Sequence, residues 1–112
     1  MSLDTLTDLP YLYLTTTGRK TGLPRQIEIW FVLHAGKFYI FAEHGHNAQW
    51  VKNIQRDANV LVRVGETVWR ATARVLEPAT DSAVWETTQA QARQKYGWGE
   101  GLPVEITPVS LA

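Results

Sequence analysis

The segment TTTGRKTGLPR, residues 15–25, combines cationic side chains with a backbone that can turn tightly. Arg19, Lys20 and Arg25 supply the charge, and Gly18 and Gly22 permit conformations that other residues avoid. Amides exposed in such a turn can form a nest for an anion, and the three cations can converge on one phosphate. The same spacing is typical of a solvated hairpin tip. The residues alone therefore indicate either a phosphate site or an ordinary surface turn.

This segment does not have the spacing of a nucleotide triphosphate loop. A Walker loop places a glycine five residues before its Gly-Lys pair, whereas here Lys20 follows Arg19 and position 15 is Thr15. Hydrolysis of nucleoside triphosphates is therefore not expected.

Other reaction centres are also missing from the sequence. Glu43, His44 and His46 lie too close together in the chain to supply three converging metal ligands, so no metal site is predicted. None of the serines stands in a nucleophile elbow, and the chain has no cysteine, which excludes disulfides and thiol catalysis. No catalytic residue is assigned.

Trp50 and Asn53 are three residues apart in a predicted helix and share one of its faces. They either present a ring and an amide to a ligand, or pack and bond a neighbouring loop. The missing acid-base groups are compatible with a redox enzyme, because a flavin-like cofactor carries the hydride and the protein need only bind, orient and exclude water.

The elements that must position these residues are mostly strands. Hydrophobic alternation and turn residues predict six strands, over 11–17, 25–33, 38–42, 59–64, 67–77 and 103–109. Helices are expected over about 47–55, capped by Asn47, and over 80–96, capped by Thr80 and ended by Gly97. Consecutive strands are joined by turns too short for crossovers, which favours a small, mainly β barrel with two helices.

Composition bounds the fold and the partners. The 112 residues suit one domain spanning 1–112, and eleven basic residues balance eleven acidic ones, so no general field attracts nucleic acid. No apolar run is long enough to span a membrane, and the acidic N-terminus lacks signal-peptide features, so a cytoplasmic location is predicted. Five Trp, four Tyr and three Phe indicate either an unusually aromatic core or flat surfaces for a planar ligand or a partner subunit.

One family shares these features. LTTTGRKTGLPR, a hairpin, a WVKNI helix, a strand with TAR and a terminal LPVEITP resemble the deazaflavin (coenzyme F420)-dependent nitroreductase and quinone reductase family, over about 12–108. The resemblance implies the split β-barrel shared with flavin-binding, pyridoxamine phosphate oxidase-like proteins. It also implies an oxidoreductase that binds coenzyme F420 and passes a hydride to a planar acceptor such as a quinone or nitro compound.

The resemblance assigns roles to individual residues. It implies that Arg19, Lys20, Thr21 and Arg25 hold the phosphate and acidic tail of the cofactor, and that Trp50 and Asn53 lie near its ring or linker. Glu43 and His44 occupy the positions where the family usually has a small polar residue and a lysine, so His44 is also a candidate cofactor contact. Trp30 replaces a substrate-facing tyrosine, and an indole can stack but does not supply a proton at neutral pH.

The resulting hypothesis is an F420-dependent reductase that acts as a homodimer. Two alternatives remain at this point: an FMN-binding reductase of the same fold, and a non-catalytic barrel that binds a lipid, haem or another flat ligand. A phosphate-bearing cofactor needs the cations of the loop, whereas a lipid carrier does not.

Overall fold

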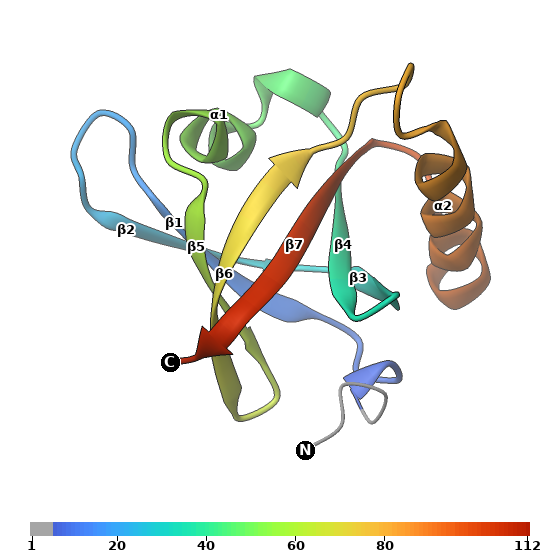
Figure 1. Cartoon of the computed structure of the whole chain (residues 1–112), viewed down its shortest axis with the longest axis horizontal. Coiled ribbons are helices and arrows are strands. Elements are labelled where there is room, and N and C mark those ends of the chain that lie inside the picture. Colours follow the sequence, from blue (N-terminus) through green and yellow to red (C-terminus); the bar gives the residue numbers. More distant parts are fainter. Residues whose placement is uncertain (1–5) are drawn as a thin grey trace.

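The computed structural model describes residues 6–112 of the chain (Figure 1). Its strands form where β-branched and aromatic residues alternate with other residues. The elements are, in chain order, β1 (Leu12–Thr17), β2 (Pro24–Ile29), β3 (Phe31–His34), β4 (Lys37–Ala42), the 3₁₀ turn η2 (Gly45–Asn47), α1 (Gln49–Arg56), β5 (Asn59–Val64), β6 (Thr67–Val75), α2 (Ser82–Tyr96) and β7 (Leu102–Leu111).

The strands form one curled, antiparallel sheet in the order β2-β1-β5-β6-β7-β4-β3. The two edge strands, β2 and β3, are consecutive in the chain and are separated only by Trp30. The predicted mainly β split barrel with two helices is therefore confirmed (Figure 1).

The prediction of one continuous strand over 25–33 is wrong at Trp30. Residues up to Ile29 pair with β1, where Ile29 lies opposite Leu12, whereas Phe31 already pairs with Ile40 of β4. One segment serves both edges of the sheet and must change direction between them. The structure consequently has seven strands where the alternation predicted six.

The core lies inside the curled sheet and is closed at one end by α1. Trp69, Ala71 and Ala73 of β6 are buried while the intervening residues are exposed, as the alternation predicted. Val51 and Ile54 of α1 are buried against this core. The helix itself begins later than expected: the predicted cap, Asn47, belongs to η2, and Ala48 is the residue that precedes the helix.

The second helix, α2, covers a separate apolar cluster formed with the strands β3 and β4 (Figure 1). The predicted cap at Thr80 is wrong, because α2 starts at Ser82 and is preceded by Asp81, whose carboxylate binds Arg74 instead of capping the helix. Its predicted end at Gly97 is confirmed, and φ there is 75°, a left-handed conformation that favours glycine. No helix within residues 6–112 has the length and apolarity to cross a bilayer.

Candidate functional site

The β1–β2 loop is closed by its own hydrogen bonds. The Gly18 amide donates to the Leu23 carbonyl oxygen at 2.8 Å, and the Gly22 amide donates to the Gly18 carbonyl oxygen at 2.8 Å. The Thr21 hydroxyl oxygen accepts from the Leu23 amide at 3.2 Å. Thr21 therefore shapes the turn, while the neighbouring Lys20 and Arg25 side chains stay exposed.

Asn53 of α1 ties this loop to the helix. Its Oδ1 accepts hydrogen bonds from the Arg19 backbone N–H at 3.2 Å and from Arg19 Nη1 at 3.0 Å, and its Nδ2 donates to Thr16 Oγ1 at 3.2 Å. Arg19 Nη2 also donates to Gln49 Oε1 at 2.7 Å. Because Asn53 is only 4% exposed and is bonded on both its oxygen and its nitrogen, it positions Arg19.

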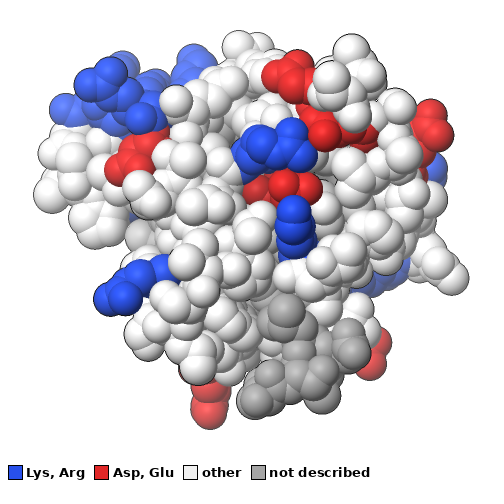
Figure 2. All heavy atoms as spheres, viewed as in Figure 1, with Lys and Arg blue, Asp and Glu red and all other residues white. Residues whose placement is uncertain are grey.

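The loop and α1 together enclose a cleft of about 580 Å³, which we call the basic cleft. Its lining includes Arg19, Lys20 and Arg25 but no Asp or Glu. Lys and Arg side chains gather over the β1–β2 loop, at the upper left of the space-filling view (Figure 2). Among the residues proposed from the sequence, those that line it are Arg19, Lys20, Thr21, Arg25, Trp50 and Asn53.

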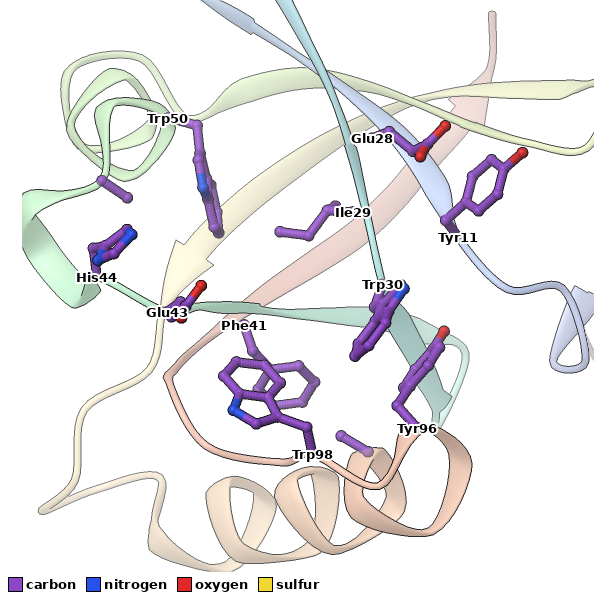
Figure 3. A pocket seen from close by; sticks show the side chains of 12 residues that line it. Tyr11, Glu28, Ile29, Trp30, Phe41, Glu43, His44, Trp50, Tyr96 and Trp98 are labelled. Carbon is purple, nitrogen blue, oxygen red and sulfur yellow. The ribbon is translucent and has the colours of Figure 1, made fainter.

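A second cleft of about 600 Å³ lies next to it and is walled by aromatic rings, and we call it the aromatic cleft (Figure 3). The residues that line it are Tyr11, Glu28, Ile29, Trp30, Phe41, Glu43, His44, Ala48, Trp50, Ala92, Tyr96 and Trp98. Trp50 lines both clefts. The two remaining residues proposed from the sequence, Trp30 and His44, line the aromatic one.

One wall of the aromatic cleft is a stacked pair of rings from distant parts of the chain. The Trp30 and Tyr96 rings are nearly parallel, with an interplanar angle of 3° and centroids 4.5 Å apart (Figure 3). Trp30 is 46% exposed, so much of its indole surface remains open to a ligand. The bend between β2 and β3 places this side chain at the cleft.

Tyr96 is held in place through its hydroxyl group. Its Oη accepts from the Phe31 backbone N–H at 3.1 Å and lies 2.7 Å from the Pro10 carbonyl oxygen and 2.9 Å from that of Phe31. A hydroxyl has one proton, which is therefore directed to one of these two carbonyl oxygens. Burial raises the pKa of Tyr96, so this proton is retained at neutral pH.

Lys95 reinforces the same wall from behind. Its Nζ donates to the Leu9 carbonyl oxygen at 2.7 Å and to that of Phe31 at 3.1 Å, and it lies 4.1 Å from the Phe31 ring centroid. Burial lowers the pKa of this ammonium. Together the two residues fasten the end of α2 to the start of β3 and to the segment before β1.

Several wall residues were not identified as site residues from the sequence, among them Tyr11, Phe41, Tyr96 and Trp98. For two of them a signal exists in the segment KYGWGEG, where aromatic residues flank the glycine that ends α2. Arg74 of β6 lines neither cleft. It forms a two-point salt bridge with Asp81, at 2.9 and 3.2 Å, which lowers the pKa of Asp81.

The chemistry of the described site is that of binding and orientation. Within residues 6–112, no group of three His, Cys, Asp or Glu side chains is arranged to hold a metal ion. The Tyr96 proton is already engaged, and the indole of Trp30 is no acid at neutral pH. A cleft lined by three cations therefore adjoins a cleft walled by aromatic rings.

Comparison with known proteins gives one family. The sequence model described as F420H(2)-dependent quinone reductase matches residues 3–107. Among solved structures, an F420-H2-dependent reductase, FDR-A, is 28% identical with a TM-score of 0.62, covering 87% of this chain and 92% of that one.

Two further structures extend the comparison. A protein described as a domain-swapped dimer is 27% identical with a TM-score of 0.63, covering 87% of this chain and 78% of its own. A pyridoxamine 5'-phosphate oxidase-like protein from Listeria innocua has a TM-score of 0.78 at 16% identity, covering 98% of this chain and 92% of its own. At that identity it supports the fold alone.

Proposed function

The chain belongs to the F420H2-dependent quinone reductase family, and we propose that its basic cleft and aromatic cleft form one continuous site for coenzyme F420 and a quinone-like acceptor. The observation that supports this most directly is the position of Trp50, which lines both clefts. A ligand with an anionic tail and a planar ring would need two adjoining clefts of this kind, and Trp50 lies where they meet.

The residues of the basic cleft fit the phosphate and acidic tail of the coenzyme. Lys20 and Arg25 are exposed and free to turn toward an anion, whereas Arg19 is already oriented by Gln49 and Asn53. A guanidinium held in advance loses little entropy on binding, and a phosphate suits its planar geometry. We infer that Arg19 fixes the phosphate and that the two exposed cations strengthen its binding.

The residues of the aromatic cleft fit two planar molecules in succession. We infer that the deazaflavin ring lies beside Trp50 and His44, and that the acceptor lies against Trp30 and its stacked partner Tyr96. Aromatic walls bind flat rings by stacking and exclude water from the space between donor and acceptor.

The bound reduced coenzyme would supply a hydride. A quinone that gained this hydride and one proton would become a hydroquinone, with the coenzyme as the two-electron reductant. Because the Tyr96 proton is donated to a backbone carbonyl oxygen, we expect the proton for the quinone to come from solvent at the open side of the cleft. The protein's contribution is then to align two rings and to keep them dry.

Titration with the coenzyme tests this proposal. The purified protein is titrated with oxidised and reduced coenzyme F420 and, separately, with FMN, following absorbance and fluorescence. We expect saturable binding of coenzyme F420, weakened by more than tenfold in Lys20→Glu and Arg25→Glu, since each change reverses a charge near the phosphate. Lys52→Glu, on α1 but outside the lining of either cleft, makes the same change in net charge and serves as the control.

Three outcomes of this titration count against the proposal. Binding of FMN alone would favour the flavin alternative of the same fold. Binding of neither cofactor would favour a non-catalytic barrel for a lipid or haem. Equal losses of affinity in all three variants would mean that net charge, not the loop, determines binding.

We also propose that the chain acts as a homodimer through the outer face of β5 and β7. Leu61 and Val109 are exposed by 40% and 67% and border the same groove on that face. Apolar side chains grouped in this way are typical of a subunit interface. Light scattering is expected to give the mass of a dimer at micromolar concentration, and Val109→Lys to give a monomer; a wild-type monomer would refute the proposal.

A cytoplasmic location is proposed as well. It is supported by the absence of cysteine, which agrees with a reducing compartment. Cell fractionation with an antibody against the native chain tests it, and recovery outside the cytoplasmic fraction would contradict it.

A further inference from the structure

The aromatic cleft has an acidic lining. It includes the carboxylates Glu28 and Glu43 and the imidazole of His44, but no Lys or Arg. Glu43 projects from the chain after β4 toward the open centre of the cleft (Figure 3). The side chain is exposed, and within residues 6–112 nothing hydrogen-bonds or ion-pairs with its carboxylate.

The cations near the cleft lie outside its lining. Glu28, at the opposite end, accepts a hydrogen bond from the Tyr13 hydroxyl at 3.1 Å, and Arg63 lies 4.1 Å from the Tyr13 ring centroid. Lys95 lies 5.0 Å from the Tyr96 ring centroid and donates to backbone carbonyls. Neither cation lines the cleft, so Glu43 is the carboxylate least compensated by its surroundings.

The aromatic rings add to this preference. The faces of Trp, Tyr and Phe rings carry negative electrostatic potential and attract cations, most strongly where water is partly excluded. The exposed face of Trp30 and the ring of Trp98 both lie along the cleft (Figure 3). A positively charged planar molecule would therefore meet attractive groups on several sides, and an anionic one would meet an uncompensated carboxylate.

We propose that the aromatic cleft selects planar acceptors that carry a positive charge over anionic acceptors of the same shape, and that Glu43 determines this selectivity. The proposal rests on the proposed function in one respect, that the acceptor binds in this cleft. The opposite charge of the basic cleft separates the two ligands: the anionic tail of the coenzyme is attracted to one end of the site and repelled from the other. The charge on an acceptor changes only how tightly it binds, and a quinone still gains one hydride and one proton.

A matched pair of ligands tests the proposal without the coenzyme. Two 1,4-naphthoquinones differ only in a short side arm that ends in trimethylammonium or in sulfonate. Their affinities are measured by quenching of tryptophan fluorescence at low ionic strength. Two charges about 7 Å apart in water interact enough to make the cationic ligand bind on the order of tenfold tighter than the anionic one. About 0.5 M salt should reduce this ratio severalfold by screening.

Variants assign the effect to one residue. Glu43→Gln should bring the ratio of affinities close to one, and Glu43→Lys should reverse it, whereas Glu66→Gln, in the β5–β6 turn, should keep the wild-type ratio. Because Glu43 is exposed, neither substitution should affect folding, which circular dichroism verifies.

Each contrary result has a distinct meaning. Equal or tighter binding of the sulfonate by the wild type, or an unchanged ratio in Glu43→Gln, would overturn the proposal. If coenzyme F420 binds and both quinones are reduced without charge preference, this inference alone fails. If the cationic preference and its dependence on Glu43 persist while no coenzyme binds, the cleft selectivity stands and the proposed function fails.

Discussion

Replacing Asn53 tests whether this side chain holds the β1–β2 loop in its binding conformation. In Asn53→Ala the loop loses both hydrogen bonds from Arg19, at 3.2 and 3.0 Å, and Thr16 loses its bond at 3.2 Å. In Asn53→Asp a carboxylate can still accept from both donors of Arg19, and the Thr16 hydroxyl can rotate to donate to it. The two variants thus separate loss of the bonds from a change of charge.

The expected magnitudes follow from burial and charge. A neutral hydrogen bond contributes about 1 kcal/mol net, and one with a charged partner contributes about 1.5–3 kcal/mol. Arg19 Nη1 is charged and Thr16 is only 2% exposed, so Asn53→Ala should lower the free energy of unfolding by about 2–4 kcal/mol. Asn53→Asp should stay within about 1 kcal/mol of the wild type, since its bonds are retained.

Urea unfolding and coenzyme titration are the two assays. Both variants should bind coenzyme F420 at least tenfold more weakly, the alanine because Arg19 is released and the aspartate because it neutralises Arg19. Gln55→Ala is the control, since Gln55 is an exposed residue of the same helix with one weak contact to His46 at 3.3 Å. If Asn53→Ala destabilises no more than this control, or if the aspartate variant is as unstable as the alanine, the reasoning is wrong.

Three further changes test the elements that carry the site. Tyr96→Phe keeps the ring stacked on Trp30 but leaves the Phe31 N–H without its acceptor, so urea unfolding should show a loss of about 1–3 kcal/mol; no loss would mean that the hydroxyl is dispensable. A Cβ at Gly99 would overlap a backbone carbonyl of α2, so Gly99→Ala should lower the melting temperature by several degrees, and an unchanged value would contradict the close approach. Arg74 lowers the pKa of Asp81 in the folded protein. The pair therefore stabilises the fold fully above the unfolded-state pKa of about 3.9, and this stabilisation is lost as pH falls through the lower pKa of the folded state. The stability difference between wild type and Asp81→Asn should accordingly shrink as pH falls from 7 to about 2, and a difference independent of pH would refute the pairing.

Local patterns in the sequence predicted most of the strands. β5 lies over residues 59–64 as expected, and the burial of Trp69, Ala71 and Ala73 follows the alternation of β6. Such patterns succeed because the period of two along a strand is a property of the backbone itself. The loop cations and Asn53, which the family resemblance assigned to one cofactor site, line one cleft of the structure.

Features that depend on distant partners were not predictable in this way. The break at Trp30 arises because one segment pairs with β1 and then with β4, and alternation carries no information about which edge a strand joins. The Trp30–Tyr96 wall joins residues far apart in the chain through contacts of Tyr96 with Phe31 and Pro10. The start of α2 was misplaced at Thr80; the residue before the helix is Asp81, whose carboxylate binds Arg74 in a tertiary contact that local pattern does not show.

The single residue between β2 and β3 has a consequence for how this site can change. Trp30 is both the covalent connection between the two edges of the sheet and part of the wall of the aromatic cleft. A substitution there alters the side chain of the wall while the backbone connection keeps its length. An insertion would lengthen the connection by about 3.3 Å per residue and widen the opening between the edges. The side chain at the wall and the separation of the two sheet edges can therefore be altered separately, by substitution and by insertion at one position.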